Sequence, residues 1–292
     1  MSKYSTELKM KVVKAYLNNE GGCEFLAKKY GIKAIAITDH DGIGGLLEGQ
    51  EAGRRHGLDV ISGIELSAED EEDKCYMHIL GYCIDHENET LKNEIIKIRK
   101  MRVERNEKLL AALREIGCKL TKEDLQLREG QDYVGKPTFA LALMKKGYIS
   151  SPKEAFKEGR FMRSDVVRRV HREKISVKKA IDLIKGAGGV PVLAHPMKIT
   201  YRSKEAGEVF FEKLEQQLIK LKKWGLEGLE CYYSEHTLNE TKRLVQLANK
   251  HSLKITAGSD FHGIGFGKSI GGFLIDENFD EHRIIMEIKS KN

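Results

Sequence analysis

The chain has 292 residues, of which 40% are hydrophobic and 32% charged, with a formal net charge of +6 at pH 7. This length suits one large domain or two modest ones, and the composition is typical of a soluble globular protein. No apolar run approaches the roughly 20 residues of a membrane span, and no N-terminal apolar run indicates a secretory signal. The five cysteines include no CxxC pair, so we expect a reduced, cytoplasmic protein without a disulfide framework.

The first 31 residues predict two short helices. The stretch "STELKMKVVKAYL" places its apolar residues near one face, with Ser5 or Thr6 as the candidate N-cap, and "NNEGG" ends it. The stretch "CEFLAKKYG" predicts a second helix that ends at Gly31, a residue suited to a C-terminal cap.

From Lys33 onward, short apolar runs alternate with helical patterns. The runs "KAIAITDH", "LDVISGIELSAE" and "CYMHILGYCID" predict strands, and "GGLLEGQEAGRRHG" predicts a helix between the first two. A long charged helix over 90–117 and a basic helical stretch to 175 predict an inserted helical subdomain. The alternation resumes at "VKKAIDLIKGAGGVPVLAHP" and continues to "SLKITAGSDFHG". Strands separated by helices predict an α/β fold with a mostly parallel sheet.

Several predicted strands end in side chains that bind metals. The candidates at strand ends are Asp39 and His40, Glu65, His195, Glu230 with His236 after it, and Asp260 with His262, and His78 lies inside a further predicted strand. In a parallel barrel the C-terminal strand ends meet on one face, where histidines and carboxylates form a metal site. A carboxylate such as Glu65 can bridge two ions roughly 3.5–4 Å apart, which together clamp a phosphate for attack by water.

The same residues also allow a purely structural interpretation. A single histidine at a strand end is more often a hydrogen-bonding structural residue than a ligand. Asp39 and Asp41 are also suited to capping the following helix, and Glu65 to pairing with one of the lysines. Residue spacing alone therefore leaves both interpretations open.

The motifs "AIAITDHDG", "GIELSAE", "HILGY", "VLAHP", "GLECYYSEHT" and "GSDFHG", in this order, resemble the PHP (polymerase and histidinol phosphatase) family. The similarity covers about residues 24–285 and includes the helical insertion. It is strongest to bacterial metal-dependent phosphoesterases that include a 5′→3′ exonuclease of short RNA and a nucleoside 3′,5′-bisphosphate phosphatase. The resemblance implies a distorted (β/α)7 barrel.

The resemblance also implies roles for individual residues. Glu65 would bridge two ions, with His78 and His195 completing the first and Asp260 the second, while His40 and His262 would bind a third. Arg102, Arg105 and Lys136 would hold substrate phosphates, although each also suits a solvated helix face. His236 and Asp39 are the candidate catalytic residues; His236 would contact phosphate or protonate the leaving oxygen, and otherwise is a satisfied loop histidine.

Two features depart from the family pattern. Family members begin with a strand that carries an HxH pair and a further histidine, whereas no histidine precedes His40 here. Where the family reads "GRPH", this chain reads "GKPT", with Thr138 in the last position. The first 33 residues are instead similar to the N-terminal helix-turn-helix of bacterial transposases. We therefore expect a transposase-like segment over 1–31 and a PHP domain over 32–292, with residues of about 90–180 inserted.

Ligand counting predicts an incomplete centre. Without the HxH strand, the first ion keeps Glu65, His78 and His195, whereas the second and third keep two protein ligands each. We expect divalent Mn, Fe or Zn, with up to three ions in the family and fewer here. Loss of the first strand also exposes sheet edges, so we predict lower stability and impaired catalysis.

Three functional hypotheses follow. The first is a metal-dependent phosphoesterase that acts on nucleotides or short oligonucleotides through metal-activated water. The second is a catalytically inactive metal-binding remnant of such an enzyme. The third is a DNA-binding protein acting through its N-terminal helices, which we disfavour because two short helices leave no room for a supporting third one.

Overall fold

The computed structural model describes residues 34–125, 134–171, 173–199, 207–261 and 272–290. The predicted N-terminal helices, the transposase-like segment over 1–31 and His262 lie outside these residues. The loss of a first strand is therefore still a prediction.

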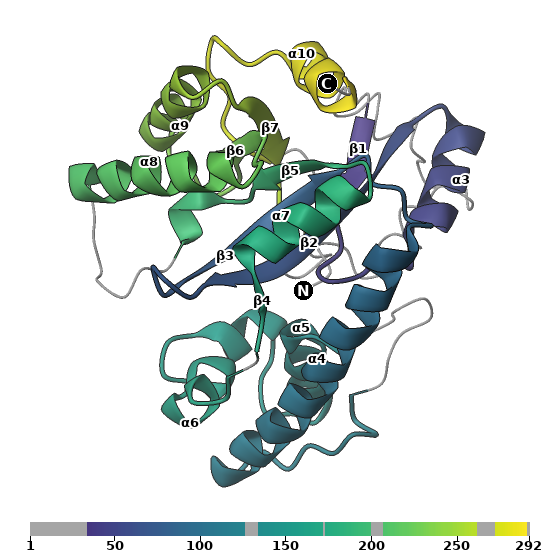
Figure 1. Cartoon of the computed structure of the whole chain (residues 1–292). Helices are drawn as coiled ribbons and strands as arrows, with labels where there is room; N and C mark the ends of the chain where they lie inside the picture. Colours follow the sequence, from purple (N-terminus) through teal and green to yellow (C-terminus); the bar gives the residue numbers. More distant parts are fainter. Residues whose placement is uncertain (1–33, 126–133, 172, 200–206, 262–271, 291–292) are drawn as a thin grey trace.

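A single curled sheet forms the centre of the molecule (Figure 1). Its strand order is β1 (Ala34–Ile37), β2 (Asp59–Asp70), β3 (Cys75–Tyr82), β5 (Val190–Leu193), β6 (Gly228–Tyr233) and β7 (Lys254–Gly258), with β4 (Ile175–Ser176) paired to β2. Most neighbouring pairs are parallel, as predicted. Strand β3 runs antiparallel to both β2 and β5, because a short turn joins it directly to β2.

Helices cover the sheet and bury its apolar side chains. They are α3 (Leu46–His56), α7 (Val177–Gly186), α8 (Gly207–Lys223), α9 (Leu238–Lys250) and α10 (Glu281–Lys289). α7 contacts β2, β3 and β5, α9 contacts β6 and β7, and α10 contacts β7. The fold is therefore a mixed α/β structure with a curled half-barrel sheet, consistent with the expected PHP barrel.

A helical group lies at one end of the sheet (Figure 1). It consists of α4 (Glu89–Glu115), α5 (Lys136–Lys145), two 3₁₀ turns, η1 (Pro152–Phe156) and η2 (Phe161–Arg163), and α6 (Asp165–Arg168). The first half of α4 packs Leu91, Ile95 and Ile98 into the core under the sheet. Its second half packs into a separate apolar cluster with α5. That this group is an insertion, and where it begins and ends, stays a prediction.

A buried polar stretch separates the two apolar halves of α4. Arg102, Arg105 and Asn106 are all buried there. Residues three and four apart share one face of a helix, so these three side chains point in one direction. α4 thus presents polar groups between the two cores.

A bulge in β6 changes which of its side chains share a face. Glu230 pairs with Thr256 and Tyr232 with Ala257, so two steps on β6 match one step on β7. The shift breaks the alternation of the strand and allows Glu230 and Tyr233 to face the same side. Tyr232 instead packs against Phe273 and Phe279.

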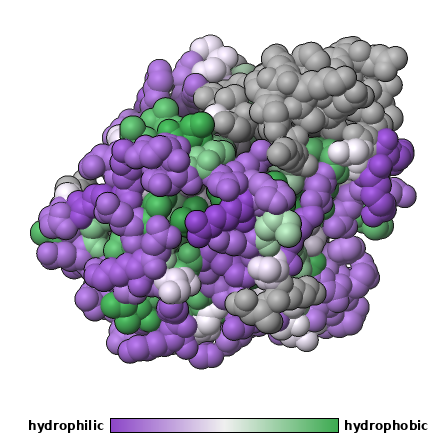
Figure 2. All heavy atoms as spheres, turned by 90° about the horizontal axis from the view of Figure 1, so that it is seen from above, coloured by the Kyte–Doolittle hydropathy of each residue, from purple (hydrophilic) through white to green (hydrophobic). Residues whose placement is uncertain are grey.

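The face seen in Figure 2 is largely hydrophilic, with hydrophobic residues gathered in several patches. Exposed large apolar side chains include Leu274, Ile275 and Met286. Within the described ranges, no helix combines the length and apolar character needed to cross a membrane.

Two glycines provide a test of the sheet packing. A Cβ added at Gly63 in β2 would lie 2.9 Å from the carbonyl oxygens of Ile37 and Gly81, whereas one added at Gly186 would meet nothing within 4 Å. We expect Gly63→Ala to lower the free energy of unfolding by about 1–3 kcal/mol, because the backbone of both neighbouring strands must move. Gly186→Ala, at the end of α7, should raise it by up to about 1 kcal/mol.

Urea denaturation of both variants beside the unaltered chain measures these changes. Equal stability of the two variants would contradict the close strand spacing at Gly63.

Candidate metal centre

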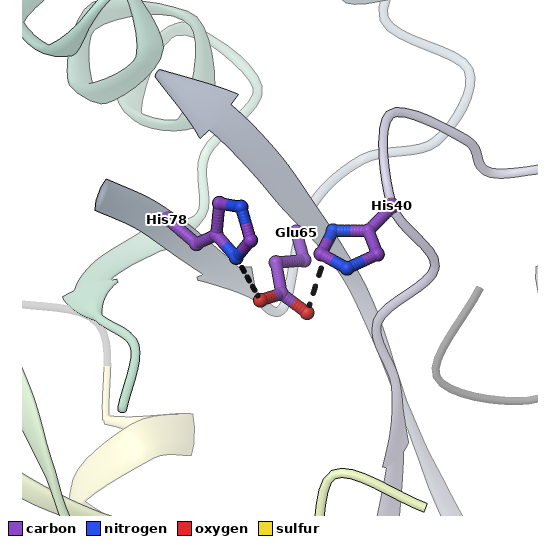
Figure 3. Close-up of side chains that lie close together, drawn as sticks. All are labelled: His40, Glu65 and His78. Atoms are coloured by element: carbon purple, nitrogen blue, oxygen red, sulfur yellow. Dashed lines mark hydrogen bonds and ion pairs between the residues drawn. The ribbon is translucent and has the colours of Figure 1, made fainter. Parts of the chain in front are cut away.

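Glu65 lies at the centre of a cluster of imidazole rings. Its side chain has no exposed surface, and its Oε1 lies 3.0 Å from Nδ1 of His78 and 3.0 Å from Nε2 of His195. Its Oε2 lies 3.7 Å from Nδ1 of His40. Figure 3 shows His40 and His78 approaching the carboxylate from its two sides. The nearest nitrogens of His78 and His195 are 3.1 Å apart, so both rings face the same small region.

Strand pairing places His40 and His78 beside Glu65. The Glu65 backbone NH donates to the Asp39 carbonyl and its carbonyl accepts from the Asp41 NH, both at 2.9 Å. These two bonds flank His40, which forms a parallel bridge with Glu65. His78 on β3 pairs with Ser67, which is two residues beyond Glu65 on the same face of β2. His78 is therefore the diagonal neighbour of Glu65.

A buried carboxylate holds the turn that carries His195. His195 follows β5 with a positive φ of 26°, a conformation that non-glycine residues rarely adopt. Its backbone NH donates to Oε2 of Glu230 at 2.7 Å. Glu230 has no exposed surface and comes from the bulged strand β6. The bulge therefore helps to fix the orientation of His195.

Burial favours the neutral forms of His40 and His78. It lowers the pKa of His40 well below its ordinary value, and it lowers the pKa of His78, although the Glu65 charge opposes both shifts. A neutral imidazole offers the lone pair that a metal ion requires. The ligand atoms of His40, Glu65 and His78 all lie within 4.8 Å of one another. Neutral nitrogens grouped around an anionic carboxylate fit a divalent cation such as Mn, Fe or Zn.

Asp260 lies in a second polar group at the end of β7. The Tyr233 hydroxyl donates to its Oδ2 at 2.5 Å and accepts from Nζ of Lys198 at 2.5 Å. The Lys198 ammonium is also 3.6 Å from Asp260 Oδ2 and 3.1 Å from Glu235 Oε2. Burial and the nearby Asp260 charge raise the pKa of Tyr233, so the phenol keeps its proton. The Tyr233 ring, 5.6 Å from that of His195, links this group to the imidazole cluster.

His236 is buried beside the same tyrosine. Its Nδ1 lies 2.9 Å from the Cys231 carbonyl, which can only accept, so Nδ1 carries the proton. Its buried Nε2 has no hydrogen-bond partner among the described residues. Burial lowers the pKa of His236, so Nε2 is unprotonated and accepts a proton or hydrogen bond.

The residues expected to bind phosphate lie on α4 and α5. Arg102 donates from Nε to Oδ2 of Asp41 at 2.9 Å, and its Nη2 contacts the same oxygen. Burial, together with the positive charges of Arg105 and Arg163, lowers the pKa of Lys136. Lys136 is the first residue of α5, and the arginines that affect its charge come from α4 and from η2.

Thr138 has a structural contact in the position where the family carries histidine. Its hydroxyl accepts from the Gly135 backbone NH at 3.4 Å, at the start of α5. Asp39, a candidate catalytic residue, is 6% exposed and lies two residues after the end of β1.

The structure thus brings together four of the residues expected to bind metal. They are His40, Glu65, His78 and His195. The sequence interpretation pairs His40 with His262, and that pairing stays a prediction because His262 is outside the described residues. The second ion expected at Asp260 is also still a prediction.

Sequence reasoning assigns no site role to Tyr233 or Lys198, and it names Glu230 only as a candidate metal ligand, not as the support of His195. Asp41 stood out only as a possible helix cap. The sequence positions of Tyr233 and Lys198 do not indicate a contact with Asp260. The bulge in β6 and the turn after β5 bring these side chains to it.

The chain is similar to several bacterial enzymes that act on phosphate esters. A 3′,5′-nucleoside bisphosphate phosphatase of Chromobacterium violaceum is 27% identical over 234 residues, covering 80% of this chain and 78% of the relative. A phosphoribosyl 1,2-cyclic phosphate 1,2-diphosphodiesterase of Eggerthella lenta is 29% identical, covering 81% and 86%. A 5′-3′ exoribonuclease of Haemophilus influenzae is 28% identical, covering 80% of each chain.

A solved structure shares the fold. The crystal structure of a metal-dependent phosphoesterase from Bifidobacterium adolescentis superposes with a TM-score of 0.75 at 29% identity, covering 90% of this chain and 87% of that one. The PHP domain family matches residues 26–224. The chain therefore belongs to the PHP domain family and is a phosphoric ester hydrolase.

Proposed function

We propose that this protein hydrolyses phosphate esters of nucleotides or short oligonucleotides with the help of divalent metal ions. The observation that carries the proposal is the fully buried Glu65 carboxylate with imidazole nitrogens facing both of its oxygens. Such an arrangement is suited to holding cations against a phosphate. The named activities of the relatives support the substrate class.

Glu65, His78 and His195 would hold one ion, because their nearest atoms all lie 3.0–3.1 Å apart. Oε2 of Glu65 and His40 offer donors on the other side, and Asp260 is a further candidate ligand. When bound, a divalent cation polarises a phosphoryl oxygen and lowers the pKa of water. The chain's own contribution is a buried anion that attracts the cation and neutral rings that do not repel it.

Lys136 and Arg105 would hold the phosphate groups of the substrate. The positive charge of Arg105 lies close enough to Lys136 to help lower the pKa of that ammonium group, together with burial. A phosphate placed there would relieve this repulsion and gain charge-assisted hydrogen bonds. His236 would accept a hydrogen bond or proton at Nε2, and Asp39 is the second candidate catalytic residue.

Loss of the HxH strand would leave catalysis weaker than in relatives that possess it. The inactive alternative retains the same buried cluster and differs only in turnover. The described residues hold no observation that favours DNA binding.

Hydrolysis assays with Glu65→Gln test the proposed function. With Mn²⁺ present, we expect the unaltered protein to release phosphate from a nucleoside 3′,5′-bisphosphate or nucleotides from a 5′-phosphorylated trinucleotide. Glu65→Gln keeps the side-chain shape but removes the anion, so it should reduce bound metal and lower kcat/KM about 100-fold or more. Glu71→Gln, an exposed residue of the turn between β2 and β3, is the matched control.

The outcomes separate the alternatives. Metal binding that depends on Glu65, without turnover of either substrate, would favour the inactive remnant. Full activity in Glu65→Gln would overturn the proposed centre.

Lys136→Met tests the phosphate site. Because burial and neighbouring charges lower the pKa of Lys136, its charged form is less favourable in the folded chain than in the unfolded one. Removing that charge should raise Tm at pH 7 by a few degrees in the absence of substrate. The same change should raise KM roughly tenfold, because a charge-assisted bond to phosphate is lost.

Lys145→Met is the control on the exposed side of the same helix, where we expect neither change. Thermal unfolding and steady-state kinetics give the two readouts. An unchanged KM in Lys136→Met would exclude Lys136 from phosphate binding.

A further inference from the structure

Arg102 makes a buried ion pair next to the imidazole cluster. We propose that Arg102 is a positioning residue, which holds the metal ligand His40 in place through Asp41 and so couples α4 to the metal centre. This inference rests on the proposed function, because it assumes that the cluster binds a cation. It assigns Arg102 a role different from the phosphate contact expected from the sequence.

Asp41 is anchored on three sides. Its Oδ2 accepts from Nε of Arg102 at 2.9 Å and also contacts Nη2 of the same guanidinium. Its Oδ1 accepts from the Ser67 backbone NH at 2.9 Å, and its own NH donates to the Glu65 carbonyl at 2.9 Å. These bonds connect Asp41, the residue after His40, to Glu65 and to Ser67. Ser67 is the residue that pairs with His78 across β2 and β3.

The backbone at Asp41 needs such support. Its φ is 50°, in the left-handed region that non-glycine residues seldom occupy. Conformations of this kind persist where surrounding contacts determine them. Without the Arg102 guanidinium, fewer contacts would stabilise the turn in the segment that carries His40.

Burial makes the pair interdependent. Asp41 has no exposed surface and Arg102 is 5% exposed. Removing one partner leaves the other charge buried without its main compensation, which is unfavourable in a low-dielectric interior. The segment would then rearrange, and His40 would move relative to Glu65. Metal sites lose affinity when their ligands shift by even a fraction of an ångström.

The position of Arg102 within α4 fits this role. It lies where the helix passes from the core under the sheet to the separate apolar cluster. Two nitrogens of its guanidinium, Nε and Nη2, already contact one oxygen of the Asp41 carboxylate. A substrate phosphate at Arg102 would have to compete with the Asp41 carboxylate. Lys136 is a more suitable phosphate ligand, because burial and the positive charges near it lower its pKa.

The experiment measures Mn²⁺ affinity and kinetics in Arg102→Met, Asp41→Asn and the double variant. Asn tolerates a positive φ and keeps the oxygen that accepts from Ser67, so Asp41→Asn removes mainly the charge. We expect each single change to weaken Mn²⁺ binding about tenfold in calorimetry. The double variant should be little weaker than the worse single one, because both changes break the same contact. At saturating Mn²⁺, KM for the substrate should stay within about twofold.

Arg114→Met is the control, since Arg114 is an exposed arginine of the same helix, and it should leave Mn²⁺ affinity unchanged. Arg102→Lys, which keeps the charge but not the fork, should bind Mn²⁺ with intermediate affinity and remains informative if Arg102→Met fails to fold. A raised KM with unchanged Mn²⁺ affinity in either variant would overturn the proposal and assign Arg102 to phosphate. Absence of Mn²⁺ binding by the unaltered protein would overturn the proposed function together with this inference.

Discussion

The buried carboxylate of Glu65 is the constraint on which the rest of the site depends. An ionised carboxylate without exposed surface is costly unless charge or hydrogen bonds compensate it. The groups around it include the imidazoles of His40, His78 and His195, and burial keeps the first two neutral. Neutral rings supply donors but no full positive charge. A divalent cation would complete this arrangement.

Three of the seven described non-glycine residues with positive φ lie at or next to these candidate ligands. Asp41, His195 and Asp260 all have positive φ, and each lies just beyond the end of a strand. Each is held by a contact from elsewhere in the chain: Arg102 on Asp41, Glu230 on the His195 backbone, and Tyr233 on Asp260. Strain of this kind is typical of functional sites, where it aims side chains that regular strands would direct elsewhere. The candidate ligands and the residues that hold their backbone or side chains in place are therefore structurally interdependent.

Much of the fold was accessible from sequence, because apolar runs of strand length alternate with amphipathic helices and end in ligand-type residues. The α/β class and the parallel pairs follow from those patterns, whereas the grouping of Glu65, His78 and His195 follows from the resemblance to the PHP family. The contacts that hold the candidate ligands in place cannot be predicted from these sequence patterns. Arg102 and Asp41 are 61 residues apart, and no local pattern pairs them. Glu230 and Tyr233 share a face only because β6 contains a bulge, which strict alternation does not predict.

Anomalous diffraction from crystals of the full chain soaked in Mn²⁺ tests the central claim most directly. If Glu65 organises a cation centre, a manganese peak will lie about 2.0–2.4 Å from its carboxylate and from an imidazole nitrogen of His78 or His195. The same crystals of Glu65→Gln should lack that peak. An ordered manganese ion elsewhere in the unaltered protein, with none beside Glu65, would contradict the account.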